Sequence, residues 1–112
     1  MAELVQYYGT GRRKSSVARI FLRPGTGIIK VNGKGFEEHF VTDVQRIIAR
    51  QSLILTETVN SFDVIANCSG GGITAQAGAV RMGIARALQE FNPELRAKMK
   101  AAGFMTRDAR QK

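Results

Sequence analysis

Three adjacent cations, Arg12, Arg13 and Lys14, are the side chains of this sequence best suited to binding a polyanion. They stand between a β-prone run at 5–8 and a run of alternating side chains at 17–23, so we expect a hairpin whose tip carries them side by side in solvent. Like charges at this spacing repel one another, and phosphate groups would neutralise them. The alternative is a solubilising loop tip, and we favour phosphate contact over it.

A run of glycines at 70–72 is the second candidate for phosphate chemistry. It separates a β-type run at 62–67 from a helical pattern that begins at Ile73. Free N–H groups and the positive end of the helix dipole can hold a phosphate at such a turn. Neither a Walker Gly-Lys-Ser/Thr nor a G-x-G-x-x-G motif is present. We therefore favour the simpler interpretation that glycine supplies positive φ and close strand-to-helix packing.

His39 and Cys68 are the only residues of their types, and neither indicates a reactive site. His39 stands beside Glu37 and Glu38, but the pattern places no second catalytic group, so we expect a surface or packing histidine. One cysteine excludes an internal disulfide and, with one histidine, offers no metal cluster. Cys68 lacks a basic neighbour that would activate it and is expected to be a half-buried thiol. With an N-terminus unlike a signal peptide, this predicts a cytosolic, reduced protein without metal or cofactor.

The chain is strongly and unevenly basic. Its 17 Lys and Arg residues outnumber 9 Asp and Glu residues, for a net charge of +8 and a pI near 10.4. Residues 1–34 hold seven basic residues and one acid (+6), residues 35–80 two and five (−3), and residues 81–112 eight and three (+5). Basic ends around an acidic middle predict two polyanion-binding regions and a nucleic-acid partner. A membrane is disfavoured, since the basic segments are not amphipathic helices and no apolar run approaches the ~18 residues that span a bilayer.

Turn signals divide the chain into β and helical segments, which predicts one α+β domain in two layers. We expect strands at 5–8, 17–23, 28–31 and 62–68, with the run at 17–23 partly covered on both faces. We expect a helical turn at 34–40 and helices that begin at Thr42-Asp43, at Ile73 and at Asn92, the last one ending at Gly103.

Apolar spacing indicates which sides of two of these helices are buried. The stripe of the first helix is expected to consist of Val44, Ile47 and Ile48, with Leu53 as its last member. The core side of the long central helix is expected to consist of Ile73, Ala77, Val80, Ile84, Leu88 and Phe91. Gly78 and Gly83 leave room there for another backbone to approach closely.

The end of the chain, 105–112, is basic, polar and without periodicity. We expect it to leave the globular part, 1–104, as an extended arm. Basic arms of this kind commonly become ordered when they bind a nucleic acid.

The chain resembles the bacterial form of the ninth protein of the small ribosomal subunit, with motifs in matching order over essentially its whole length. The motifs occur at 8–16, 70–73, 76–79, 83–88, 102–104 and 106–110. The resemblance implies an α+β fold with a four-stranded, mostly antiparallel sheet packed on helices. It also implies a left-handed crossover, as in the second domain of the small subunit's fifth protein.

The resemblance further implies a structural protein, not an enzyme, that binds small-subunit rRNA in the head of the subunit beside neighbouring head proteins. Arg12, Arg13 and Lys14 would contact the RNA backbone, and the arm would thread into rRNA. The full set of expected rRNA contacts is Thr10, Arg12, Arg13, Lys14, Ser15, Lys34, Arg81, Thr106, Arg107, Arg110, Gln111 and Lys112.

Two departures from the family pattern affect these expectations. Family members continue into a basic tail that approaches the peptidyl-site tRNA, whereas this sequence stops at Lys112, so no tRNA contact can be assigned to it. The chain is either truncated, which we favour, or a member that lacks this reach. In the central motif, Ala75 replaces a commonly small Gly, and Met82 stands where a polar His is common, which puts a polar role at that position in doubt.

Two other functions remain open from the residues. One is a small-molecule phosphotransfer enzyme, against which stand the lack of a magnesium-ligand pair, of a lysine beside the glycines at 70–72, and of length for a second lobe. The other is a nucleic-acid chaperone that binds any RNA of the same length equally through charge alone.

Overall fold

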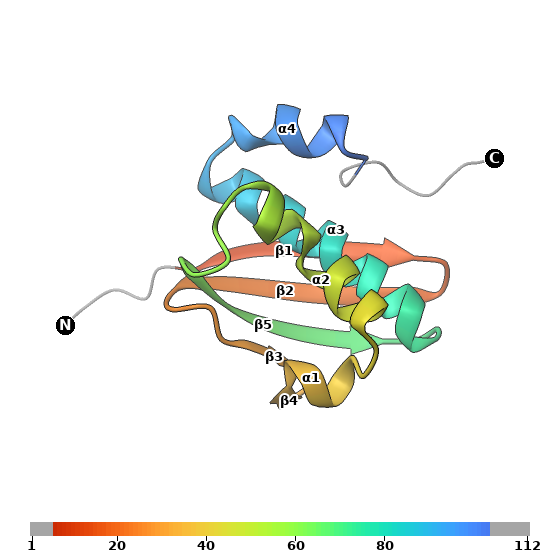
Figure 1. Ribbon diagram of the computed structural model, residues 1–112. Helices are drawn as coiled ribbons and strands as arrows, with labels where there is room; N and C mark the ends of the chain where they lie inside the picture. The colour runs from red at the N-terminus through yellow and green to blue at the C-terminus, as the bar shows by residue number, and fades with distance from the viewer. Residues whose placement is uncertain (1–5, 104–112) are drawn as a thin grey trace.

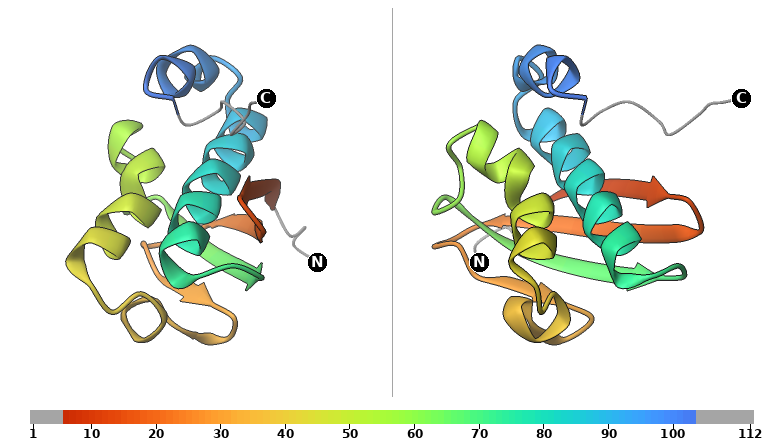
Figure 2. Two further views of the ribbon diagram at one scale, coloured as in Figure 1. Left: turned by 90° about the vertical axis from the view of Figure 1, so that its right-hand side faces the viewer. Right: turned by 45° about the vertical axis from the view of Figure 1, so that its right-hand side comes forward.

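The alternating side chains that follow the basic turn form an interior strand of a sheet. The computed structural model describes residues 6–103, and within them five strands are ordered β1-β2-β5-β3-β4. The strands are β1 (Tyr7–Arg13), β2 (Ser16–Pro24), β3 (Ile29–Val31), β4 (Lys34–Gly35) and β5 (Phe62–Ser69). The helices are α1 (Phe36–His39), α2 (Asp43–Leu55), α3 (Ile73–Phe91) and α4 (Leu95–Ala101). Helices α2 and α3 cover one face of the sheet and leave the other face open (Figures 1 and 2).

The α+β class is confirmed, but the predicted four-stranded sheet is wrong in detail. The fifth strand, β4, arises because Asn32 and Gly33 adopt positive φ, +52° and +80°, and turn the chain back on β3. Strand β3 pairs parallel to β5, because the chain passes through α1 and α2 between these two strands. The left-handed sense of this crossover and the likeness to the fifth protein stay predictions.

Strand β1 is longer than predicted and contains two of the three adjacent cations. It continues through Gly9 and Gly11 to Arg13, in register with β2 up to the pair Arg13–Ser16. Only Lys14, with φ of +56°, and Ser15 form the turn. Side chains of successive strand residues point to opposite faces, so the expectation of three cations side by side is wrong.

Helix α3 is the core helix that the sequence predicts. Its middle residues Ala77, Val80, Ile84 and Leu88 are fully buried, whereas the two ends of the expected side, Ile73 and Phe91, are exposed. The predicted approach of another backbone occurs at Gly83, which lies against β1 and β2. The final helix begins at Leu95, later than the expected Asn92, whose Oδ1 accepts a hydrogen bond from the N–H of Glu94 at 3.1 Å.

Helix α2 begins at the predicted cap, but only Ile48 and Leu53 of its expected apolar stripe pack on the core. The Thr42 hydroxyl accepts a hydrogen bond from the N–H of Gln45 at 3.2 Å. Val44 and Ile47 are 63% and 54% exposed. The small residues Ala49 and Ser52 are buried beside the expected Leu53 and take the place of Val44 and Ile47. The Ser52 hydroxyl donates to the carbonyl of Arg81 at 2.8 Å.

Two side chains of α3 occupy the outer edge of β1. The guanidinium of Arg86 donates to the carbonyl of Thr10 at 3.0 Å, and the carboxylate of Glu90 accepts from the N–H of Tyr8 at 3.2 Å. Edge strands with unpaired backbone groups invite association with other chains. These two contacts therefore fix α3 on the sheet and protect the edge of the sheet.

No helix within residues 6–103 has the length and apolar character to cross a membrane.

Asp63 should hold the turn before β3 in a pH-dependent manner. Its Oδ1 accepts hydrogen bonds from the N–H groups of Ile28, Thr26 and Gly27 at 3.0, 3.0 and 3.1 Å, and these bonds lower the pKa of the carboxyl from its ordinary 3.8. A group with a depressed folded pKa stabilises the fold above its unfolded pKa and loses this effect as the pH falls through the folded value. We therefore expect the protection factors of these three amides in hydrogen exchange to fall once the pH drops below 3.8.

The variant Asp63→Asn is the matched test, because it keeps an oxygen acceptor and removes the charge. It should show lower protection of the three amides at neutral pH and little further loss in acid. Equal protection in both proteins at every pH would contradict this role.

Candidate nucleic-acid interface

Three cations meet at the end of the β1–β2 hairpin, where it lies against the start of α3. We call Arg13, Lys14 and Arg81 the tip cluster. They surround a concavity of about 320 Å³. The remaining lining residues come from α2 and the first turns of α3: Ile48, Thr74, Ala75 and Gly78. None of the residues described around this concavity is acidic.

Packing and hydrogen bonding position the two arginines of the tip cluster. A Cβ at Gly78 would lie 3.3 Å from Cδ of Arg13, so the Arg13 stem passes close over the helix backbone there. Arg81 donates to Oε1 of Gln51 at 2.6 Å and is thereby fixed between α3 and α2. Burial and, to a lesser extent, the charge of Arg13 lower the pKa of Arg81. An anion bound between the two guanidinium groups would relieve this repulsion.

The glycine run joins the hairpin to α3, as the simpler interpretation predicts. Gly70 and Gly71 have positive φ, +75° and +62°, and a Cβ on either would collide with Ser15 or Ser16. The Ser16 hydroxyl donates to the carbonyl of Gly70 at 3.0 Å, and Nε2 of Gln76 donates to the same oxygen at 3.0 Å. The glycines thus bring the N-terminal turn of α3 next to Lys14, so the packing interpretation does not exclude a phosphate site.

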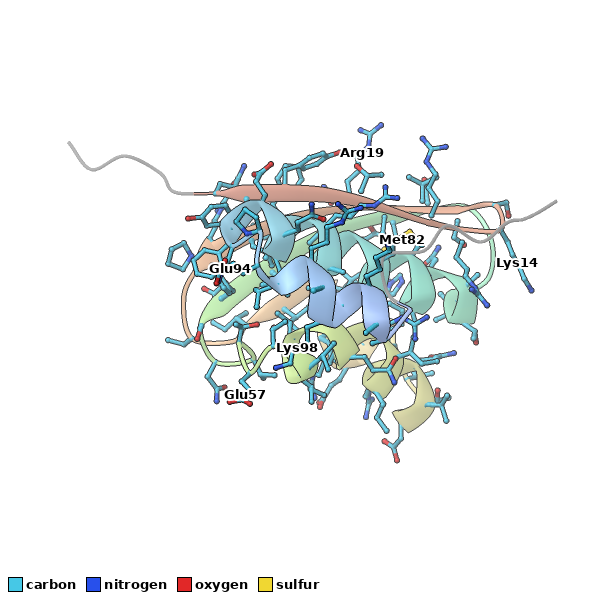
Figure 3. The ribbon with its side chains drawn as sticks, turned by 90° about the horizontal axis from the view of Figure 1, so that it is seen from above. Lys14, Arg19, Glu57, Met82, Glu94 and Lys98 are labelled. Carbon is cyan, nitrogen blue, oxygen red and sulfur yellow. The ribbon has the colours of Figure 1, made fainter. Side chains whose placement is uncertain are left out.

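Arg12 belongs to a different surface. Its neighbours in β1, Gly11 and Arg13, face α3, whereas Arg12 lies on the open face of the sheet. There Arg12 and Arg19 line a second concavity of about 390 Å³. In Figure 3, Arg19 points away from the helices, while Lys14 lies at the far end of the hairpin beside the start of α3. The other lining residues are Val17, Asn67, Cys68 and Ser69.

The remaining expected contact residues are dispersed. Thr10 lies on the open face with Arg12, and its hydroxyl donates to that of Tyr8 at 2.8 Å. Ser15 is exposed in the turn beside Lys14. Lys34 lies on β4, at the edge of the sheet opposite β1, and does not join the tip cluster. The predicted arm lies outside the described residues, and with it Thr106, Arg107, Arg110, Gln111 and Lys112.

Sequence reasoning missed most of the open face. Arg19, Phe21 and Arg23 alternate with the fully buried Ala18, Ile20 and Leu22. This alternation is visible in the sequence, but its mixture of apolar and charged residues predicts partial cover on both faces. Helices cover only the face that carries Ala18, Ile20 and Leu22, because α2 and α3 lie on the same side of the sheet (Figure 2).

The isolated histidine is a packing residue, as predicted. Its Nε2 lies 2.7 Å from Oε1 of Gln76, and its ring lies edge-on to Phe40 with centroids 4.8 Å apart. Met82 is 7% exposed, so a polar role there is disfavoured. Within residues 6–103 no three His, Cys, Asp or Glu side chains are grouped as metal ligands would be.

Cys68 should react slowly with alkylating agents. Burial raises the pKa of its thiol to about 11, so about one molecule in a thousand carries the reactive thiolate at pH 8. We expect iodoacetamide to modify the folded protein at pH 8 far more slowly than free cysteine, with a rate that rises up to about pH 11. Unfolding in guanidinium should restore the ordinary rate. A folded protein that reacts at the free-cysteine rate at pH 8 would show that Cys68 is not protected.

Cations gathered on both faces at one end of the sheet of an α+β protein are the charge pattern typical of proteins that bind polyanions. The family model described as "Ribosomal protein S9/S16" matches residues 11–112, and the chain therefore belongs to the ribosomal protein S9/S16 family. The resemblance inferred from the sequence is confirmed at this level. Family membership makes the chain an rRNA-binding structural constituent of the small ribosomal subunit, typically without enzymatic activity.

Proposed function

We propose that the tip cluster binds the phosphate backbone of rRNA in the head of the small subunit. The observation that carries this proposal is the meeting of Arg13, Lys14 and Arg81 around one concavity, of whose lining residues within 6–103 none is acidic. The N-terminal turn of α3 adds its dipole and N–H groups to the same place, since Gly72 precedes it without a side chain that could cap them.

The proposed mechanism is neutralisation of phosphates at a fixed geometry. Arg13 and Arg81 present planar donor groups that suit phosphate oxygens, and Lys14 adds a mobile point charge at the turn. The hydrogen bond from Arg81 to Gln51 limits the motion of its guanidinium, so less conformational entropy is lost when RNA binds. Contacts of this kind recognise the shape of the backbone more than the base sequence.

The same proposal extends to the parts of the chain that lie away from the tip cluster. Lys34 would be a separate contact at the opposite edge of the sheet, and the arm at 105–112 would reach a further rRNA element. Neighbouring head proteins in the cytoplasmic ribosome would be the other partners. Approach to peptidyl-site tRNA belongs to the tail of the family and is assigned to no residue of this chain.

Binding to a small-subunit head rRNA fragment, compared with a scrambled RNA of equal length across a salt series, tests this proposal. We expect a preference for the head fragment of at least ~100-fold that persists in moderate salt. Equal binding to both RNAs, disappearing together as salt rises, would favour a chaperone that acts by charge alone. Binding of ATP with magnesium at millimolar concentration, competing with RNA, would favour the phosphotransfer alternative, since Lys14 does lie near the start of α3.

A further inference from the structure

The open face of the sheet is the face that the helices do not cover, and it lies on the opposite side of the sheet from the tip cluster. This face combines aromatic rings with cations. Tyr8 of β1 pairs in register with Phe21 of β2, and Thr10 pairs with Arg19. Because side chains two residues apart share a face, these residues form one continuous patch with a repeat of about 7 Å along the strands. No helix covers this patch (Figure 2).

The aromatic pair is held in place and remains accessible. The rings of Tyr8 and Phe21 lie with centroids 5.0 Å apart and planes tilted by 49°. The hydroxyl of Thr10 donates to that of Tyr8 at 2.8 Å, which restricts the phenol ring. Tyr8 is nevertheless 41% exposed, so a flat apolar group can stack on it.

Cations adjoin the aromatic pair, and the described carboxylates nearest to it lie at the margins of the patch. Arg12 and Arg19 line the neighbouring concavity of about 390 Å³, with polar groups of Asn67 and Ser69 beside them. Asp63 of β5 pairs in register with Arg23, and its Oδ1 accepts three backbone N–H groups, while Glu90 of α3 accepts from the N–H of Tyr8 at the outer edge of β1. The patch therefore offers positive charge next to an exposed ring.

We propose that this open face binds an unpaired segment of RNA, with one base stacked on Tyr8 and adjoining phosphates held by Arg12 and Arg19. Bases inside an A-form helix are stacked on one another and cannot reach a flat protein face, whereas splayed single-stranded bases can. The inference rests on the proposed function in taking RNA as the partner. It adds a second site on the other face of the sheet, so the domain would lie between two RNA elements.

The test uses the full 112-residue chain and a short single-stranded RNA that carries 2-aminopurine, a base whose fluorescence changes on stacking. We expect Tyr8→Leu to weaken binding by about 5- to 100-fold and to abolish the fluorescence change, because stacking on one aromatic side chain contributes this much. The matched control Tyr8→Phe keeps the ring and should bind within about threefold of the unmodified chain. A Tyr8→Leu protein that binds and quenches like the unmodified chain would overturn the inference.

Two further measurements separate binding at the open face from a loss of folding and from binding at the tip cluster. They use a charge variant and a duplex competitor. Arg19→Gln, at an exposed position, should retain the fluorescence change while lowering the salt slope of log K by about 0.7. A fully paired RNA of the same sequence should compete poorly for the open face. Equal competition by the duplex would overturn the inference. If the unmodified chain quenches 2-aminopurine as expected but shows no preference for head rRNA over the scrambled RNA, the proposed function is contradicted and this inference is not.

Discussion

Gly11→Ala should destabilise the fold by about 3 kcal/mol or more, near the upper end of the range for overpacked cores. A Cβ at this position would lie 1.8 Å from the carbonyl oxygen of Ala79 and 2.5 Å from the nitrogen of Gly83. Both atoms belong to the backbone of α3, so no side chain can rotate out of the way. Strand and helix would have to separate, which would also weaken the contacts that Arg86 and Glu90 make with β1.

Thermal unfolding measures this effect. A destabilisation of about 3 kcal/mol corresponds to a decrease in Tm of at least about 12 °C for a domain of this size. The matched control is Gly72→Ala, because a Cβ there meets nothing within 4 Å and the backbone φ of −92° suits alanine. The control should remain within about 1 kcal/mol of the unmodified protein. If both variants unfold at the same temperature, close packing of β1 on α3 is not what stabilises the fold.

The double variant Arg13→Gln with Lys14→Gln should weaken binding to head rRNA by roughly 10- to 100-fold at low salt. Removing one phosphate contact should lower the slope of log K against log salt by about 0.7 to 0.9, so we expect a decrease of about 1.5 for the two substitutions. Both side chains are exposed, and the fold should therefore retain its Tm.

A second double variant separates the position of the charges from their number. Lys98→Gln with Lys100→Gln removes two exposed cations from α4 and leaves the tip cluster intact. We expect a much smaller decrease in affinity from this pair at equal net charge. Equal decreases in the two double variants would mean that RNA responds to net charge, and the tip cluster would have no special role.

The sequence predicted the elements whose signals are local. The run at 17–23, the cap at Thr42 and the period of α3 all appear where expected, because alternation, capping and helical spacing are properties of neighbouring residues. The stripe on α2 is correct at Ile48 and Leu53 and wrong at Val44 and Ile47, because the small residues Ala49 and Ser52 pack more closely on α3 than those two could. The spacing of large apolar residues does not reveal a helix interface that is formed by small side chains.

The candidate site was predicted in composition but not in arrangement. Arg12 and Arg13 are adjacent in the sequence, yet strand geometry sends them to opposite faces once β1 is known to continue through its glycines. Arg81 joins Lys14 only because Gly70 and Gly71 fold against the hairpin. The parallel pairing of β3 with β5 likewise depends on a crossover, and pairing between distant strands leaves no local pattern.

Lysine acetylation of the chain, free and bound to head rRNA, tests the central claim most directly. Mass spectrometry gives the rate at each lysine, and the free chain serves as the reference for every position. If the tip cluster holds the RNA backbone, Lys14 is acetylated more slowly in the complex, while Lys98 on α4 keeps its rate. Unchanged acetylation of Lys14 in a saturated complex would contradict the proposed interface.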